Sequence, residues 1–377
     1  MCGVSESDES EEADSSRSFL LSRIPLLIGG AAALVLGLCT GLVRMGVSAP
    51  FDALAEFHGP LLICGFFGTL TSLERAAAAN RPFAYLAPSL CVSGTALIFA
   101  GVPMAGAALY ALAAALVCVP ALGRAARERK LFAVTLAGPS SAWLVGNLVW
   151  LSGAPVPDAG GFWLMFLVLV IGGERLEFGR PRPRTALFPA LFWTSLALLA
   201  AGSWMTVSDA LGGALFGAGL FLSALWIGWH DLRLCLSRRS GKGRFMAVNL
   251  MAGCVWLGIG GLVQMVGAAG TNAFAYDMTI HAVVIGFALS MVFAHALLVF
   301  PAIVRAELVF SFALYVPVAL LQAAIALRLI GGLMQWMEAR MLSGTMTVLA
   351  LVLFATIVAA ASLRARYIAA VRQPVRA

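Results

Sequence analysis

Long apolar runs separated by short polar segments make up almost the whole chain. A helix needs about 20 apolar residues to cross a bilayer, and runs that can serve as spans recur twelve times. The connecting segments leave no room for a soluble domain. The pattern therefore predicts an all-α, polytopic membrane protein with twelve transmembrane helices at roughly 24–45, 58–74, 83–101, 104–123, 131–152, 161–173, 185–204, 210–230, 245–268, 278–304, 309–332 and 342–363.

Polar tails flank the bundle predicted at 24–363. Residues 6–14 hold six acidic side chains, and we expect 1–23 to be a disordered acidic tail and 364–377 a basic tail. A secretory signal peptide begins with a basic stretch, so the first apolar run is not interpreted as a cleaved signal.

The basic residues lie almost entirely on one side of the predicted bundle. Twelve spans put both termini on the same side, and 22 of the 25 Lys and Arg residues fall there. Only Arg44, Arg328 and Arg340 lie on or near the other side. Because Lys and Arg concentrate in cytoplasmic loops, both termini are predicted to be cytoplasmic.

Composition excludes the main soluble classes. The chain is 61% hydrophobic and 11% charged, whereas soluble proteins carry about 45–50% apolar and about 25% charged residues. Disordered proteins, disulfide-rich scaffolds and nucleic-acid modules do not fit these proportions. The proportions instead make the lipid bilayer the first predicted partner. The seven cysteines form no close pair with metal-ligand spacing.

Two of the four histidines carry the candidate chemistry. His58 opens the second span and His281 opens the tenth, and both spans run inward, so the two side chains are predicted at one depth near the outer face. Such a pair suits the two axial positions of a haem iron. Gly65, Gly68 and Gly286 would then leave room for the porphyrin plane. The alternative is two interfacial histidines that face headgroups or bond to the backbone.

His295 and His230 are candidates for a second site. His295 follows His281 by 14 residues, which places both on nearly the same helix face, about 21 Å apart along the axis. This spacing suits a second stacked haem. His230, at the inner end of the eighth span, is the remaining histidine, although its depth agrees poorly. His295 is therefore a ligand of a second haem or metal, or a plain hydrogen-bonded histidine, and His230 is more simply an interface residue.

Charged residues near the span ends complete the candidates. Arg44 and Arg328 lie where the propionates of an outer haem would point, and propionates need charge-assisted donors. The simpler interpretation is that these arginines snorkel to the interface. Glu74 and Glu174 end their spans beside arginines, as anchoring ion pairs or as an entry or docking site. A proton pump would need acids at mid-depth, and none is recognised.

The pattern resembles two known families. A twelve-span chain with outer histidines on helices 2 and 10 resembles subunit I of the haem–copper oxidases. It is more similar to the NnrS family of bacterial membrane haem proteins, which is linked to nitric oxide stress and denitrification. The matching residues are His58 with Gly65-Phe66, His281-Ala282 with Gly286 and Met291, and, more weakly, Asn249–Gly258 with Trp256.

The resemblance implies a haem b held by His58 and His281. It also implies electron transfer, or a response to nitric oxide or its detoxification, with a respiratory electron carrier or quinol as partner. Spans 6 and 7 contain no histidine, and position 283 is Val. The oxygen-reducing copper centre of the oxidases is therefore not expected in that form, and the scarcity of histidines argues against copper.

Two other classes fit twelve spans. A secondary transporter often has twelve helices with both termini inside. However, the loop 73–83 lacks the Gly-x-x-x-Asp-Arg signature of the major facilitator group, and no pair of broken helices is evident. An assembly factor of a respiratory complex is the third hypothesis, and in it the histidines would hold no cofactor.

Overall fold

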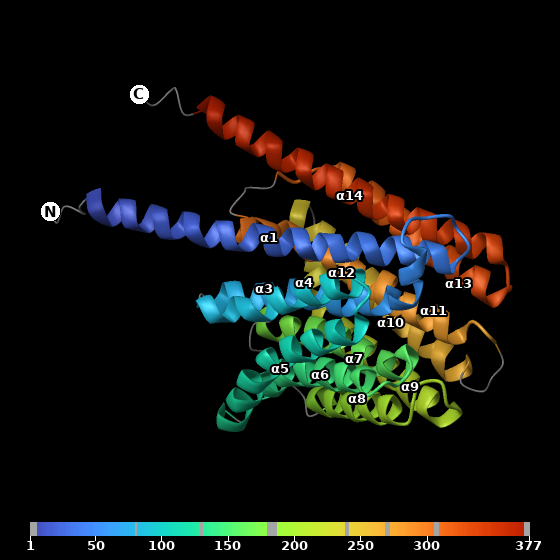
Figure 1. Ribbon diagram of the computed structural model, residues 1–377. Coiled ribbons are helices and arrows are strands. Elements are labelled where there is room, and N and C mark those ends of the chain that lie inside the picture. Colours follow the sequence, from blue (N-terminus) through green and yellow to red (C-terminus); the bar gives the residue numbers. More distant parts are fainter. Residues whose placement is uncertain are drawn as a thin grey trace.

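The computed structural model describes residues 6–79, 81–128, 131–178, 187–237, 241–267, 272–304 and 309–372. The described segments form helices that run side by side along one common direction (Figure 1). Eleven of these helical segments are long and apolar enough to cross a membrane. The helical, membrane-spanning class predicted from the sequence is thereby confirmed.

Most of the spans are single helices. They are α1 (Glu6–Arg44), α4 (Leu86–Phe99, preceded by the 3-10 turn η3, Pro82–Tyr85), α5 (Pro103–Glu128), α6 (Leu131–Leu151), α7 (Val156–Phe178), α8 (Leu187–Trp204), α9 (Ala210–Ser237), α10 (Gly241–Gly267), α13 (Tyr315–Leu333, preceded by the 3-10 turn η5, Phe312–Leu314) and α14 (Met337–Arg372). The helix α6 corresponds to the fifth predicted span, and the other single helices are among the eleven.

The two spans that carry the candidate histidines are composite. The second consists of η1 (Asp52–Phe57), α2 (His58–Pro60), η2 (Leu61–Phe67) and α3 (Gly68–Ala79). The tenth consists of α11 (Ala275–His281), η4 (Ala282–Leu289) and α12 (Ser290–Val304). Both η2 and η4 are π-helices, and each follows a histidine closely along the chain. Such π-helical turns are rare and concentrate at functional sites.

The first and last helices extend beyond the predicted spans. The helix α1 already begins at Glu6, inside the segment 1–23 that we expected to be disordered, and α14 continues to Arg372 through most of the expected basic tail. Acidic residues are favourable in the first turn of a helix because they interact with the partial positive charge at its N-terminus. Ala, Leu and Arg are strong helix formers, which suits the extension of α14. Residues 1–5 and 373–377 lie outside the described part.

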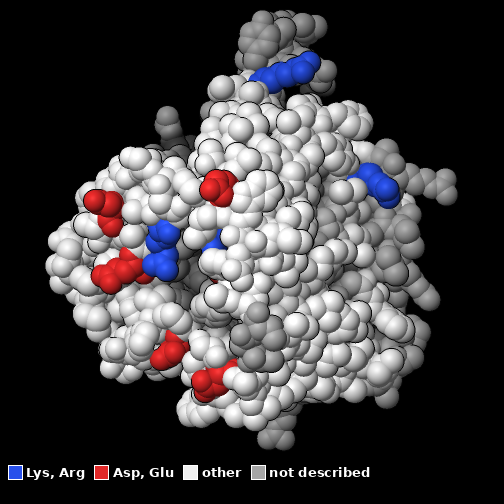
Figure 2. All heavy atoms as spheres, turned by 90° about the vertical axis from the view of Figure 1, so that its right-hand side faces the viewer, with Lys and Arg blue, Asp and Glu red and all other residues white. Residues whose placement is uncertain are grey.

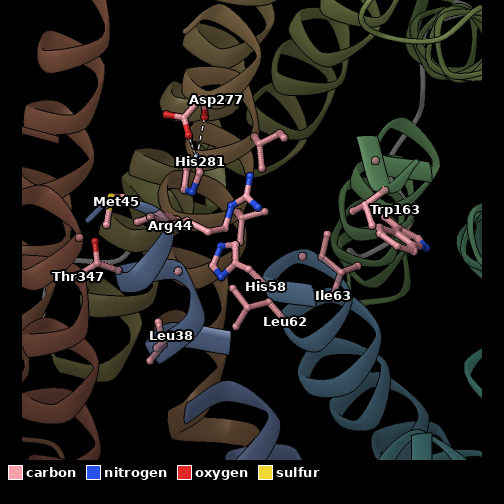
Figure 3. Close-up of a pocket in the computed structure, with 18 of the residues that line it drawn as sticks. Leu38, Arg44, Met45, His58, Leu62, Ile63, Trp163, Asp277, His281 and Thr347 are labelled. Carbon is pink, nitrogen blue, oxygen red and sulfur yellow. Dashed lines mark hydrogen bonds and ion pairs between the residues drawn. The ribbon is translucent and has the colours of Figure 1, made fainter. Parts of the chain in front are cut away.

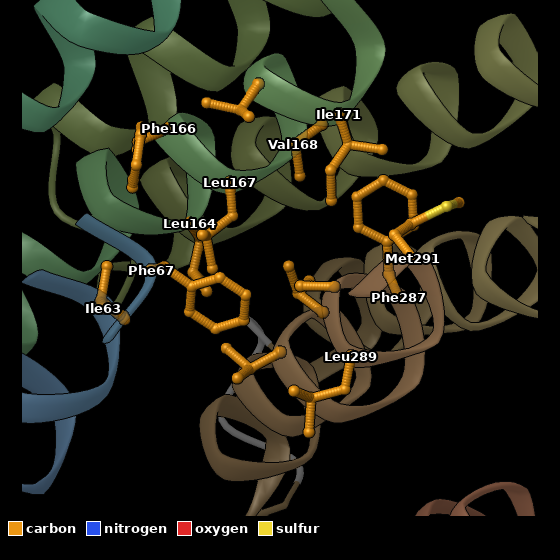
Figure 4. Close-up of a cluster of buried hydrophobic side chains, with 14 of the residues drawn as sticks. Ile63, Phe67, Leu164, Phe166, Leu167, Val168, Ile171, Phe287, Leu289 and Met291 are labelled. Atoms are coloured by element: carbon orange, nitrogen blue, oxygen red, sulfur yellow. The ribbon is translucent and has the colours of Figure 1, made fainter. Parts of the chain in front are cut away.

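The core lies where the two composite spans meet α7. The segment Val156–Gly173 of α7 is the most enclosed of the eleven spans, with 83% of its residues buried. Figure 4 shows Phe67 from η2, Leu164 and Leu167 from α7, and Phe287 and Leu289 from η4 in one apolar cluster. This packing fixes the two histidine-bearing spans against a common partner and sets their relative depth.

The described charges divide between the two ends of the bundle. The start of α1 and the end of α14 lie at the same end (Figure 1). Figure 2 faces the opposite end and shows acidic side chains spread over it, with basic side chains near its middle. The helix ends and turns there contribute Asp52, Glu56, Asp158, Asp209, Asp277, Glu338, Arg44, Arg328 and Arg340. The side chains of Glu174 and of the basic cluster at 175–184 lie outside the described residues.

Candidate functional site

A cavity of about 630 Å³ opens between α1, the two composite spans, α7, α13 and α14. We call it the histidine cavity, because His58 and His281 both line it (Figure 3). Ligand pockets in proteins typically measure about 300–1,000 Å³. Most of the lining is apolar. Its charged residues and histidines are Arg44, Glu56, His58, Asp277, His281, Arg328 and Arg340.

The two imidazoles lie close together with nearly parallel planes. The ring centroids of His58 and His281 are 6.4 Å apart, and the angle between the ring planes is 17°. The two residues come from different composite spans and are 223 positions apart in the sequence. The depth predicted for both histidines is therefore matched by direct juxtaposition in the fold.

Each imidazole uses Nδ1 to contact a backbone carbonyl. Nδ1 of His58 lies 2.6 Å from the carbonyl oxygen of Gly37, and Nδ1 of His281 lies 2.7 Å from that of Asp277. Because a carbonyl can only accept, Nδ1 is the protonated nitrogen and Nε2 of a neutral ring keeps its lone pair. Among the described residues, neither Nε2 has a hydrogen-bond partner. Both rings are thus prepared to offer Nε2 to an external group.

Glycines on α1 make room for His58. A Cβ atom at Gly41 would lie 2.5 Å from Cε1 of the His58 ring, and one at Gly37 would lie 2.5 Å from Cδ2 of Leu62. The close approach of α1 to the second span therefore depends on the absence of side chains at these positions. The same approach gives the Gly37 carbonyl access to the imidazole.

A buried charge cluster surrounds the Asp277 carboxylate. Arg328 donates to both carboxylate oxygens, from Nη2 at 2.7 Å and from Nε at 3.2 Å, and Nη2 of Arg340 lies 3.1 Å away. Arg328 is 4% exposed and Arg340 is 8% exposed. Arg340 also lies over the ring of Phe274, 3.8 Å from its centroid. Because buried charges are costly unless they are paired, this cluster ties α11 to α13 and α14.

Arg44 differs from the other two arginines of the cavity. It is exposed, and within the part of the chain that the structure describes it has no hydrogen bond or ion pair. Figure 3 shows it beside the two imidazoles. Three arginines and two carboxylates line the cavity, so the lining carries one net positive charge. The cavity is suited to a largely apolar molecule that carries an anionic group.

The described candidate His295 does not line the cavity. His295 lies on α12, where its Nδ1 is 2.8 Å from the carbonyl oxygen of Met291, and it is absent from the lining. The face shared with His281 was predicted from an uninterrupted α-helix, and the π-helix η4 between the two histidines changes that rotation. The side chain of His230 lies outside the described residues, so its pairing with His295 stays a prediction.

The three glycines expected beside a porphyrin have another role. A Cβ at Gly65 would meet Thr95 and Tyr110, one at Gly68 would meet Trp143, and one at Gly286 would meet Trp256. These glycines allow the composite spans to pack against neighbouring helices and do not face the cavity. The expectation that these three glycines leave room for a porphyrin is therefore corrected.

Asp277, Arg340 and Glu56 complete the polar lining but were not among the sequence candidates. Asp277 lies four residues before His281, a spacing that places two side chains on one helix face. This spacing was the signal in the sequence that could have identified Asp277 as a neighbour of His281. Arg340 was recognised as an outer arginine, but the sequence gives no sign that it pairs with Asp277.

One comparison with known proteins identifies a family for this chain. A family model described as "Domain of unknown function (DUF8744)" matches residues 23–363, a range that includes every residue lining the histidine cavity. No curated protein and no solved structure matches the chain.

Proposed function

The chain belongs to the DUF8744 family, and we propose that it is a membrane haem b protein with His58 and His281 as the axial ligands. The pair of nearly parallel imidazoles with centroids 6.4 Å apart carries this proposal. A metal–imidazole bond is about 2.0–2.1 Å long, so two imidazoles on opposite faces of one metal hold their centroids on the order of 6 Å apart. The observed separation matches this requirement.

The donor set and the cavity support the same ligand. Both Nε2 atoms keep their lone pairs, because both Nδ1 atoms are directed at carbonyls. The apolar lining suits a porphyrin. The guanidinium of Arg44, which has no ion pair among the described residues, suits a propionate. Arg328 is already occupied by Asp277, so Arg44 is the better propionate donor of the two arginines predicted for that role.

The two-sided ligand arrangement favours electron transfer. A bound haem b supplies one-electron redox chemistry. His58 and His281 would both be engaged in holding the haem, so neither would be free to make way for a small molecule. Direct binding of nitric oxide, as the resemblance to the NnrS family suggests, would require one histidine to move away. We therefore place electron transfer first, with a respiratory electron carrier or quinol as partner, and a nitric oxide response second.

We also propose that the histidine cavity opens towards the outer side of a bacterial cytoplasmic membrane. The proposal rests on the positive-inside rule, because 22 of the 25 basic residues fall on the side of the termini. A fusion of alkaline phosphatase to the C-terminus should be inactive, and a fluorescent-protein fusion at the same place should fold and fluoresce. The reverse result would contradict this orientation.

The haem content of the purified protein tests the proposal. Wild-type protein, expressed with sufficient haem supply, should give the pyridine haemochrome spectrum of haem b and the electron paramagnetic resonance signal of a low-spin ferric haem. The variants His58→Ala and His281→Ala should each lose both signals. His295→Ala is the matched control, because His295 also lies on the tenth span but does not line the cavity.

Two results would overturn the proposal. One is wild-type protein that folds and contains no haem, and the other is full haem content in both cavity variants. In either case the net positive cavity would favour the secondary-transporter hypothesis, with an anionic solute as the cargo. Arg44, which no other described residue pairs with, would be available to that solute. Uptake of anions into vesicles that contain the purified protein would then be the measurement. No described contact favours the assembly-factor hypothesis.

A further inference from the structure

The two proposed ligands have different surroundings. Nδ1 of His58 contacts the carbonyl oxygen of Gly37, which is neutral. Nδ1 of His281 contacts the carbonyl oxygen of Asp277, and Oδ1 of the Asp277 carboxylate lies 3.4 Å from the same nitrogen. One residue thus presents both a neutral acceptor and an anionic group to the Nδ1–H of His281. No described residue does this for His58.

We propose that Asp277 is a positioning residue that sets the strength of His281 as an electron donor to the haem iron. The inference rests on the proposed function and deepens it. A carboxylate beside the distal N–H of a metal-bound histidine fixes the ring orientation and makes the ligating nitrogen more basic. A more basic ligand stabilises the oxidised metal, so Asp277 lowers the reduction potential of the site.

Arg328 and Arg340 determine how much of the negative charge reaches the ring. Arg328 engages both oxygens of Asp277, and Arg340 adds a contact to Oδ2. Each arginine withdraws charge from the carboxylate and so opposes its effect on His281. The cluster therefore links the conformation of α13 and α14 to the ligand on α11. Removal of the carboxylate and removal of one arginine should shift the potential in opposite directions.

Glu56 provides a matched control for the carboxylate. It also lines the histidine cavity, so its removal changes the charge of the cavity by the same amount. Within the described part of the chain, no hydrogen bond or ion pair joins it to either imidazole. A shift that is larger for Asp277→Asn than for Glu56→Gln therefore reports the effect transmitted through His281, and not the loss of one charge from the lining.

The experiment is a redox titration of the haem-loaded protein, followed by absorbance, with electron paramagnetic resonance of the oxidised form. Asp277→Asn should raise the midpoint potential by more than Glu56→Gln, and should change the g-values of the low-spin signal. Equal shifts in the two variants, with unchanged g-values, would overturn the inference and leave the proposed function intact. Wild-type protein without haem would overturn both.

Asp277→Asn leaves two buried arginines without their carboxylate and can therefore fail to fold. In that case Arg340→Gln provides a second test. With Arg340 removed, Asp277 keeps its two contacts with Arg328 and exerts more of its charge on His281. The midpoint potential of Arg340→Gln should fall below that of the wild type. A rise or no change would overturn the inference.

Discussion

The imidazole of His58 packs directly against Gly41 of α1, and this contact leaves no room for a side chain at position 41. A Cβ atom at position 41 would lie 2.5 Å from Cε1 of the imidazole, well inside normal van der Waals separation. The His58 ring cannot simply rotate away, because its Nδ1 is held at the Gly37 carbonyl. The position of the proposed ligand therefore depends on a glycine in a different helix.

The first prediction follows from this contact. Gly41→Ala should displace the His58 ring and lower the haem content per chain severalfold, measured by the pyridine haemochrome method. The control is Gly59→Ala, next to His58, where a Cβ would meet Val156 at an ordinary 3.7 Å. That variant should keep wild-type haem content. Equal haem content in the two variants would show that the His58–Gly41 contact does not position a ligand.

The second prediction separates the two arginines that the sequence suggested as propionate donors. Arg328→Gln should destabilise the protein by about 3–5 kcal/mol, because it breaks a buried ion pair. Arg44→Gln removes an exposed side chain that has no partner among the described residues. It should change stability by about 0.5 kcal/mol or less and should weaken haem retention. Unfolding in detergent measures the first effect, and haem loss to apomyoglobin measures the second.

The third prediction concerns the buried amide of Asn147 on α6. Asn147 is 0% exposed, accepts from Cys64 and from the indole of Trp163, and donates to the carbonyl of Tyr110. Asn147→Ala leaves these buried groups without their partner and should cost about 2 kcal/mol. Asn249→Ala should cost less, because the only described acceptor for that amide is the Phe245 carbonyl in its own helix. Equal losses in thermal unfolding experiments would contradict this assignment.

The fourth prediction concerns the close contact of α9 with α10. A Cβ at Gly261 would lie 2.6 Å from the carbonyl oxygen of Gly217, which is backbone and cannot move aside. Gly261→Ala should therefore separate the two helices and destabilise the protein by about 1–3 kcal/mol. Gly258→Ala on the same helix meets Ala224 at 3.6 Å and should be nearly neutral. If both variants unfold alike, small residues do not determine this interface.

The sequence was sufficient to predict eleven membrane-spanning helices and to bring His58 and His281 to one level. Apolar length predicts a membrane helix directly, since the bilayer imposes a minimum length. The direction of each span follows from counting spans, and this placed His58 and His281 at one level. Both inferences use only the length of each apolar segment and the order of the segments, and both can be read directly from a sequence.

The parts that were missed depend on contacts between helices or on irregular helix geometry. The π-helices at 61–67 and 282–289 depart from the 100° per residue of an α-helix. The rotation from His281 to His295 therefore cannot be calculated from their spacing alone, and their shared face stays a prediction. The pairing of Asp277 with Arg340 joins residues 63 positions apart. The packing roles of Gly65 and Gly286 depend on partners in other helices, which apolar periodicity does not identify.

The wall of the histidine cavity joins two helices that lie far apart along the chain. Leu38 and Gly41 of α1 form part of this wall, and Gly344 and Thr347 of α14 form another part. During synthesis α1 enters the bilayer long before α14, so the wall remains incomplete until the ribosome has delivered residues near 348. Any molecule held in the cavity is therefore enclosed only after α14 has been translated.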